Sequence, residues 1–266
     1  MLAAVALLPL LVLSRPTVAN AERGGAACPT NNEDTALSAG SGQASHTPTS
    51  NDYLSSFAEL ARVQWPKNRT LRIVCHGHSV PAGYFKTPDV QTLEAYPHLL
   101  HAGLSARFPH AVINVIVTAI GGEASPAGAE RFARDVLSLR PDVVTIDYGL
   151  NDRRVGLEAA RKAWAAMIEQ AQSADIKVIL LTPTPDMSAQ LAEPTEPLIQ
   201  HAAQIRALAA EYRVGLVDSL AAFLDATSSG RALSDLMSQH NHPNRAGHEL
   251  VAENLLKWFP AAPAVP

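Results

Sequence analysis

The chain has little of what marks several common classes of protein. It has only two cysteines in 266 residues, Cys28 and Cys75, and we expect both to be free thiols, because an exported disulfide scaffold carries more cysteines at regular spacing. Charged residues make up only 17% of the chain, the net charge is −4, and no run of Lys and Arg is present to bind phosphates. These shortages argue against a disulfide scaffold and against a nucleic-acid partner.

The sequence also lacks an apolar run long enough to cross a bilayer, so no stable membrane insertion is expected. The apolar run Leu2–Leu13 covers only twelve residues and precedes Ala19-Asn20-Ala21, an A-x-A cleavage signal. This pattern predicts a signal peptide over residues 1–21 and export to the periplasm or beyond the cell. The alternative is a misassigned start codon ahead of an accidental Ala/Leu run.

Composition divides the rest of the chain. Residues 22–51 are rich in Gly, Ala, Ser, Thr, Asn and Pro and predict a disordered linker, because such a segment buries too little apolar surface to fold. We expect one folded domain over residues 52–260 and a Pro/Ala tail over residues 261–266. The chain as a whole is 47% hydrophobic, enough for a sizeable core, and it shows no repeat of fixed period.

Within the domain, apolar strands alternate with helices. The predicted strands are Leu71–Cys75, Val112–Val117, Val143–Ile146, Lys177–Leu181 and Gly215–Val217. Helical spacing of apolar residues predicts helices over 157–171 and 198–212, a short helix from about 52 to 61, and a last helix after Gly247. Strands that are continuously apolar are buried on both faces. The alternation therefore predicts an α/β fold with a parallel sheet covered by helices.

Three separate polar segments offer the parts of one active site: Gly77-His78-Ser79, Gly149-Leu150-Asn151-Asp152 and His242-Pro243-Asn244. The first two follow predicted strands, and ligands of such sheets bind beyond the carboxyl ends of the strands. A serine, a histidine and an amide can supply a nucleophile, a base and an oxyanion donor. Each segment also has a plainer interpretation. Ser79 can be a turn residue, Asp152 can cap the next helix, and Asn244 can cap the last one.

Two other chemistries fit the sequence less well. The esterase motif G-x-S-x-G is absent, because the residues after Ser79 are Val80 and Pro81. His240 and His242 form an H-x-H pair that His76 and His78 could complete as a metal site. The carboxylate ligand that a hydrolytic metal site usually adds is not found near them in the sequence. We therefore expect no metal and no other cofactor.

Four segments in this order resemble the SGNH (GDSL) hydrolase family: Gly77-His78-Ser79 with Gly83, Ala119-Ile120-Gly121-Gly122-Glu123, Gly149-Leu150-Asn151-Asp152, and His242-Pro243-Asn244 with Gly247-His248. The resemblance covers residues 71–258. It implies a three-layer α/β/α sandwich, flavodoxin-like, with a five-stranded parallel sheet. It also implies ester hydrolysis, with Ser79 as nucleophile and His242 as general base. The backbone N–H groups of Ser79 and Gly122 and the side-chain amide of Asn151 would form the oxyanion hole. Which of Gly121 and Gly122 faces the oxyanion stays open.

Two residues depart from the family pattern. His78 stands where an aspartate that structures the loop is common, which leaves activity possible. Gln239 stands where the family places an aspartate three residues before the histidine, and a neutral amide stabilises an imidazolium poorly. Three alternatives remain open. A backbone carbonyl in the 239–241 turn orients His242, or Asp235 replaces the missing carboxylate, or the activity is lowered.

The substrate is less well defined by the sequence. The loops at residues 81–90, with Tyr84 and Phe85, and at residues 183–197 are expected to wall the pocket, and their small and apolar residues suit a short acyl chain, a lysolipid or an acetylated sugar. The predicted substrate is a small-molecule, carbohydrate or lipid ester. Two rival functions remain, namely an O-acyltransferase on the same fold and a non-catalytic relative that binds glycan or a partner protein.

Overall fold

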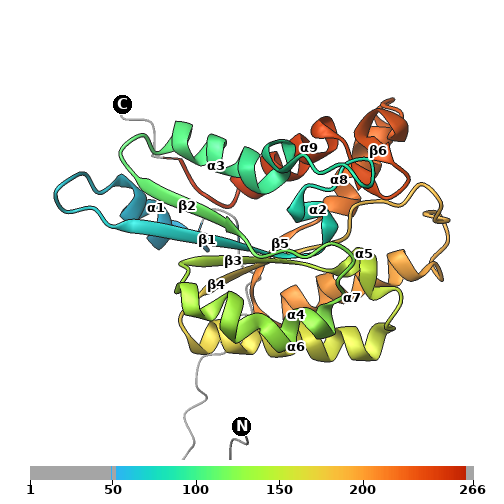
Figure 1. The fold of residues 1–266 in the computed structure, drawn as a ribbon, viewed down its shortest axis with the longest axis horizontal. Helices are drawn as coiled ribbons and strands as arrows, with labels where there is room; N and C mark the ends of the chain where they lie inside the picture. Colours follow the sequence, from blue (N-terminus) through green and yellow to red (C-terminus); the bar gives the residue numbers. More distant parts are fainter. Residues whose placement is uncertain (1–48, 50–51, 262–266) are drawn as a thin grey trace, which may run out of the picture. The chain divides into compact units, whose positions relative to one another are not determined.

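A five-stranded parallel sheet forms the centre of the computed structural model, which describes residues 49 and 52–261 (Figure 1). The strand order is β2-β1-β3-β4-β5, the flavodoxin-like order. The strands are β1 (Thr70–Gly77), β2 (Val112–Val117), β3 (Val143–Asp147), β4 (Lys177–Leu181) and β5 (Gly215–Val217). All pairs are parallel. The predicted signal peptide, nearly all of the predicted linker and the tail after residue 261 lie outside the described residues.

Helices cover both faces of the sheet and complete the predicted three-layer sandwich. One layer holds α1 (Ser55–Arg62), α3 (Tyr96–Arg107), α8 (Ser219–Ser228) and α9 (Arg245–Leu256), and the other holds α4 (Ser125–Asp135), α6 (Leu157–Ser173) and α7 (Pro197–Tyr212). Figure 1 shows α3 and α9 above the sheet and α4 and α6 below it. Each face has its own hydrophobic cluster, centred on Leu100 and Val251 on one side and on Trp164 and Met167 on the other.

The apolar runs explain why the strands form where they do. Every residue of β3 is buried, as predicted for a central strand of a parallel sheet, and this includes the polar residues Thr145 and Asp147. The edge strand β2 differs from the prediction of burial on both faces, because it is exposed at Val112 and Asn114 and buried at Ile113, so one of its faces is partly open to solvent. The buried residues of α6 recur at helical spacing, as predicted. Cys75 lies buried in β1 as a free thiol, whereas Cys28 is outside the described residues.

Short elements follow the carboxyl ends of the strands. The helix α2 (Ser79–Ala82) follows β1, and the helix α5 (Gly149–Asp152) follows β3. Three 3-10 turns lie elsewhere in the described part of the chain, at η1 (Thr92–Glu94), η2 (Leu137–Leu139) and η3 (Leu233–Leu236). Before α9 the chain forms a small antiparallel hairpin, β6 (Met237–Gln239) and β7 (His242–Pro243), which the sequence did not predict. These short elements carry the polar segments that the sequence singled out.

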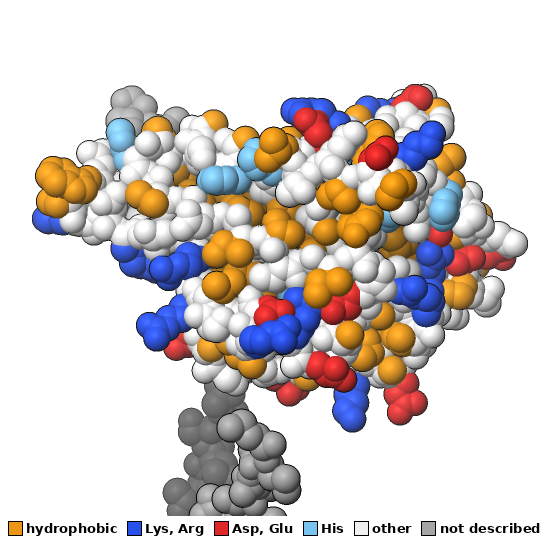
Figure 2. Space-filling model, viewed as in Figure 1, with side chains coloured by type: hydrophobic (Ala, Val, Ile, Leu, Met, Phe, Trp, Pro, Cys, Tyr) orange, Lys and Arg blue, Asp and Glu red, His pale blue; other side chains and the backbone are white. Residues whose placement is uncertain are grey.

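Charged and hydrophobic side chains both occur on the surface of the domain. Figure 2 shows basic and acidic side chains interspersed over the viewed face, with hydrophobic side chains gathered across its middle. Within residues 52–261 the structure has no helix that is both long and apolar enough to span a bilayer.

Candidate active site

Ser79 is the first residue of α2, at a tight turn that leaves the end of β1. A Cβ at Gly77 would lie 2.4 Å from the carbonyl oxygen of Asp147 on the neighbouring strand, so only glycine fits there. The turn closes at Gly83, whose φ of +90° is a left-handed conformation that glycine adopts at little cost. The first amides of a helix have no partner within the helix, so the N–H of Ser79 is available to a ligand.

The structure brings Ser79 and His242 together although they are far apart in the sequence. The serine Oγ lies 2.8 Å from His242 Nε2, and both side chains are buried, at 6% and 5% exposure. Burial lowers the pKa of His242 below its usual value of 6.5, and it outweighs the hydrogen bond with the carbonyl of Phe85, which acts in the opposite direction. A neutral imidazole at hydrogen-bond distance from a serine hydroxyl can act as a general base.

A backbone carbonyl orients His242, but from a different segment than the sequence suggested. The imidazole Nδ1 lies 3.2 Å from the carbonyl oxygen of Phe85, in the loop after α2, rather than against a carbonyl of the 239–241 turn. Asp235 does not replace the missing carboxylate, since within the described part of the chain its side chain forms neither a hydrogen bond nor an ion pair with His242, whose Nδ1 faces Phe85 and Gln239. The structure therefore contains a serine–histidine pair oriented by a carbonyl.

Gln239 stands behind His242 but presents its amide nitrogen to the ring. Its Oε1 accepts a hydrogen bond from the N–H of Thr87 at 3.0 Å, and its Nε2 donates to Asn241 Oδ1 at 2.9 Å. These contacts assign the orientation of the amide. They leave Nε2 at 2.8 Å from His242 Nδ1. A donor at that position opposes a proton on Nδ1, and it therefore opposes the imidazolium that forms during proton transfer.

The predicted oxyanion donors lie on two turns that hydrogen bonds join. Asn151 Nδ2 donates to the carbonyl of Glu123 at 2.9 Å, which uses one of its two hydrogens and leaves the second for a ligand. The carbonyl of Gly122 accepts from the guanidinium of Arg154. The N–H of Ile120 donates to the carbonyl of Gly77 at 3.0 Å, which ties this turn to the residue two before the serine.

The two glycines of this turn have different surroundings. A Cβ at Gly121 would meet the ring of Tyr84 at 2.7 Å, so Gly121 is needed for close packing. Gly122 has a φ of +79° and open space at its Cβ position. Of the pair, Gly122 is therefore the one whose surroundings leave room for a ligand.

Two residues near the site have roles that the sequence did not predict. The ring of Tyr84 packs between Gly121 and the ring of His242, with ring centroids 6.0 Å apart, and so screens the histidine. Asp152 lies inside α5 and does not cap α6, whose first turn follows Gly156. Its carboxylate instead accepts from the N–H of Ser125 at 2.8 Å and from Trp164 Nε1 at 2.7 Å. Asp152 thereby holds α5, which carries Asn151, against α4 and α6.

Beneath the serine lies a second buried histidine with a carboxylate beside it. Nδ1 of His78 accepts the N–H of Val80 at 3.1 Å, so His78 caps α2 and fills the loop-structuring role expected of this position. Its Nε2 lies 3.3 Å from Asp147 Oδ1. Tyr96 donates its hydroxyl to the other oxygen of Asp147 at 3.2 Å. The only sequence signal for Asp147 was a carboxylate at the end of an apolar run.

Two cavities adjoin the site. One, of about 400 Å³, is lined by Leu150, Asn151, Arg153, Arg154, Asp186, Glu196, Pro197, His240 and Asn241. The other, of about 340 Å³, is lined by Met187, Ser234, Met237, Ser238, Gln239 and His240. The first cavity is polar and includes the predicted donor Asn151, with Arg153 paired to Asp186 at 2.7 Å. Residues of the 183–197 loop thus wall a cavity next to the site, as expected, whereas no residue of the 81–90 loop lines either of these two cavities.

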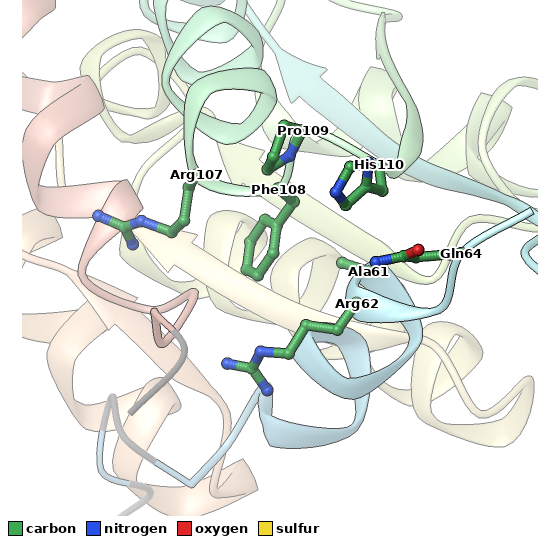
Figure 3. A pocket seen from close by; sticks show the side chains of 7 residues that line it. All are labelled: Ala61, Arg62, Gln64, Arg107, Phe108, Pro109 and His110. Atoms are coloured by element: carbon green, nitrogen blue, oxygen red, sulfur yellow. The ribbon is translucent and has the colours of Figure 1, made fainter. Parts of the chain in front are cut away.

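A third cavity, of about 230 Å³, is lined by other elements, α1 and the end of α3 (Figure 3). Its two arginines donate hydrogen bonds to backbone carbonyls at the C-terminal end of the domain, Arg62 to Pro260 and Arg107 to Leu256 and Phe259. These bonds tie both arginines to the backbone, although Arg62 Nε has no hydrogen-bond partner among the described residues, and the cavity contains none of the predicted site residues.

The alternative metal site does not form. His76 points to Thr118 Oγ1, at 2.8 Å, and to the carbonyl of Gly128, at 3.1 Å, in the layer that contains α4. His240 is exposed and lines the cavities described above. Among the described residues no three His, Cys, Asp or Glu side chains are grouped so that they could hold a metal ion.

A parallel α/β/α sandwich that carries a hydrogen-bonded serine and histidine at the carboxyl edge of its sheet has the arrangement of a hydrolase. A family model described as the GDSL-like lipase/acylhydrolase family matches residues 75–250. The chain therefore belongs to this family and is a hydrolase that acts on ester bonds.

Solved structures with the same fold are also esterases. The acetylxylan esterase Axe2 from Geobacillus stearothermophilus is 22% identical, with a TM-score of 0.62 over 71% of this chain and 94% of that chain. A catalytic mutant of Axe2 has a TM-score of 0.64 at 20% identity, over 76% and 97% of the two chains. A two-domain esterase active on acetylated mannans has a TM-score of 0.63 at 22% identity, over 79% of this chain and 54% of that one. No curated protein sequence matches the chain.

Proposed function

We propose that this protein is a serine esterase that removes acetyl groups from carbohydrate through an acyl-enzyme. The observation that supports this most directly is the 2.8 Å contact between Ser79 Oγ and His242 Nε2 at the carboxyl edge of the sheet. The esterases that share the fold act on acetylated xylan or acetylated mannan, which suggests the class of substrate. The polar cavity beside Asn151 suits a sugar better than a long acyl chain.

In this mechanism Ser79 Oγ attacks the ester carbonyl carbon while His242 Nε2 takes the hydroxyl proton. The tetrahedral oxyanion receives hydrogen bonds from the N–H groups of Ser79 and Gly122 and from the side chain of Asn151, and each such donor typically lowers the barrier by about 3 kcal/mol. His242 then gives its proton to the leaving sugar hydroxyl. Water, activated by the same histidine, attacks the acetyl-enzyme and releases acetate.

The position of Gln239 favours a modest rate in this mechanism. Catalytic mutants of Axe2 replace a serine, a histidine, or an aspartate that lies three residues before the histidine. The corresponding position here is Gln239, so only the carbonyl of Phe85 is available to accept from the Nδ1–H of the imidazolium. A neutral carbonyl stabilises that charge less than a carboxylate does.

The test is acetate release from acetylated xylan and acetylated mannan by the wild-type protein and by Ser79→Ala. We expect turnover that is lost in the variant, and covalent labelling of Ser79 by a fluorophosphonate probe. Esters with longer acyl chains should react more slowly than acetyl esters. A folded wild-type protein that neither releases acetate nor takes the label would refute the proposal.

The same assay separates hydrolysis from transfer, the rival activity on this fold. Adding a free xylo-oligosaccharide should leave acetate as the product if water is the acceptor. Acetylated oligosaccharide would instead identify a transferase. Export is part of the proposal, because a polysaccharide substrate lies outside the cell. Sequencing the mature N-terminus after expression with its leader should show cleavage after Ala21, and an uncleaved intracellular product would argue against export.

A further inference from the structure

We propose that Asp147 acts through His78 to keep the hydroxyl of Ser79 available to His242. In this role the carboxylate holds the ring proton of His78 on Nε2, so that the lone pair of Nδ1, rather than an N–H, faces the serine. Asp147 and His78 are thus positioning residues for the nucleophile. The inference rests on the serine mechanism proposed above, and the experiment below distinguishes a failure of the inference from a failure of that mechanism.

The serine hydroxyl lies between two imidazole rings. His242 Nε2 is at 2.8 Å from Oγ, and Nδ1 of His78 is at 3.5 Å. The same Nδ1 accepts the backbone N–H of Val80 at 3.1 Å, and a nitrogen that accepts a hydrogen bond carries no proton. The hydrogen-bond network therefore assigns the proton of His78 to Nε2.

The nearest charge to that proton is the carboxylate of Asp147. Nε2 lies 3.3 Å from Asp147 Oδ1, which is an electrostatic contact rather than a formed hydrogen bond, and Nε2 has no hydrogen-bond partner within the described part of the chain. Both side chains are buried, His78 at 0% and Asp147 at 3% exposure. A buried carboxylate attracts an N–H and repels a ring lone pair, because little solvent screens its charge. Its second oxygen is held by the hydroxyl of Tyr96, so the carboxylate is fixed in place.

The other tautomer of His78 would interfere with the reaction. A proton on Nδ1 would face the N–H of Val80, and it would be directed at Ser79 Oγ. The oxygen would then accept a hydrogen bond through the lone pair with which it attacks the ester. The first turn of α2, which presents the N–H of Ser79, would also lose its cap.

The main test is a double-mutant cycle on acetyl-ester hydrolysis with Asp147→Asn, His78→Asn and the double variant. An asparagine at 147 can offer either its oxygen or its NH₂ group to His78, so the proton is no longer confined to Nε2. We expect Asp147→Asn to lower kcat and the rate of fluorophosphonate labelling about tenfold, with KM unchanged, because the pair does not touch substrate.

An asparagine at 78 can still cap Val80 and has no ring proton. In that background, the further change at 147 should leave kcat unaltered.

Asp142→Asn is the matched control, because Asp142 precedes β3 and Asp147 ends it. The Asp142 carboxylate contacts Arg69 and the N–H of Arg72, away from the serine, and its loss should leave kcat unchanged. The inference would be overturned if Asp147→Asn lowered kcat by the same factor in the wild-type background and in the His78→Asn background. The carboxylate would then act without His78. If Ser79→Ala retained turnover, the proposed mechanism itself would fail.

A direct measurement covers the case in which Asp147→Asn does not fold. Nitrogen-15 NMR of the histidine rings distinguishes the two tautomers, and His78→Asn identifies the signals of His78. In the wild-type protein we expect a protonated Nε2 and an unprotonated Nδ1. A protonated Nδ1 in His78 would overturn the inference.

Discussion

In the proposed mechanism, the side chain behind His242 affects how the positive charge of the ring is stabilised during proton transfer, and that side chain is Gln239. The contacts of its amide with Thr87 and Asn241 leave a nitrogen, rather than an oxygen, facing His242. The sequence showed that a carboxylate was absent here. It could not show that the carbonyl of Phe85 takes over, because a backbone oxygen has no side-chain signature in a sequence.

The pH dependence of the wild-type esterase should reflect this environment. The general base must be neutral, so kcat/KM rises as the pH passes upward through the pKa of His242. Burial lowers that pKa, and the rise should therefore be complete below the pH expected for an ordinary histidine of pKa 6.5. A pH–rate profile of acetate release measures this, and a midpoint above 6.5 would contradict the expected direction of the shift.

Gln239→Asp should restore a carboxylate behind the imidazole. We expect the midpoint of the pH–rate profile to move to higher pH and kcat above that midpoint to increase by about tenfold, since the carboxylate stabilises the imidazolium. Gln239→Asn is the control, because it has the length of aspartate without the charge, and it should produce neither change. Matching profiles for the two variants would show that charge at this position does not matter.

Among the elements, the strands were predicted well and the small pieces around the site were not. Long apolar runs placed β2, β4 and β5 at their observed bounds, and β1 and β3 within two residues. The hairpin β6–β7 was missed, because strands of three and two residues are too short to show an alternating pattern. The expected capping of the last helix by Asn244 is confirmed, since its side chain accepts from the N–H of Gly247.

The conformation of the turn that carries Gly122 can be tested by a substitution whose side chain meets no neighbouring atom. At a φ of +79° an alanine is strained by about 1 kcal/mol even where nothing blocks its Cβ, so Gly122→Ala should shift the turn and its N–H. We expect kcat to fall by about 10²-fold, the typical effect of losing one oxyanion donor. Gly230→Ala is the control, because Gly230 has a similar φ of +96° and equally open space after α8. Similar losses of kcat in both variants would indicate general strain rather than a lost donor.

The cap of α9 should also stabilise the hairpin that carries His242. Asn244 accepts from Gly247 and donates to the carbonyls of Asp235 and Met237. Asn244→Ala should reduce the free energy of unfolding by about 1–2 kcal/mol in urea titrations and should lower kcat as well. Asn244→Asp keeps the cap and loses the donor, so its loss of stability should be smaller. If both variants were as stable as the wild type, these bonds would contribute nothing.

For the molecule as a whole, the two faces of the sheet each bury a histidine that stays neutral. Burial lowers the pKa of His76, beneath α4, to about 4 and that of His248, in α9, to about 3. In the unfolded chain both should titrate near 6.5. The unfolded state therefore binds more protons than the folded state as the pH falls below about 6.5, and the folded state is destabilised.

Stability should accordingly fall between pH 7 and pH 4. Each histidine contributes at most about 1.4 kcal/mol per pH unit to the free energy of unfolding. Urea unfolding at pH 7, 6 and 5 measures how steeply the free energy of unfolding depends on pH. The variant His248→Gln should make this dependence less steep, because it removes one titrating group. The glutamine oxygen can still accept the N–H of Tyr96, so that hydrogen bond is kept. An unchanged slope in this variant would mean that His248 does not contribute to the acid sensitivity.

The contact between Ser79 and His242 joins residues 163 positions apart, and it has a consequence for how the enzyme comes into being. During synthesis all five strands of the sheet emerge before the hairpin that carries the base. In the proposed mechanism, a nascent chain or a fragment that stops before Met237 has its nucleophile but no base to activate it. Such a chain stays inert toward esters until the hairpin and α9 have been made and have docked against the sheet.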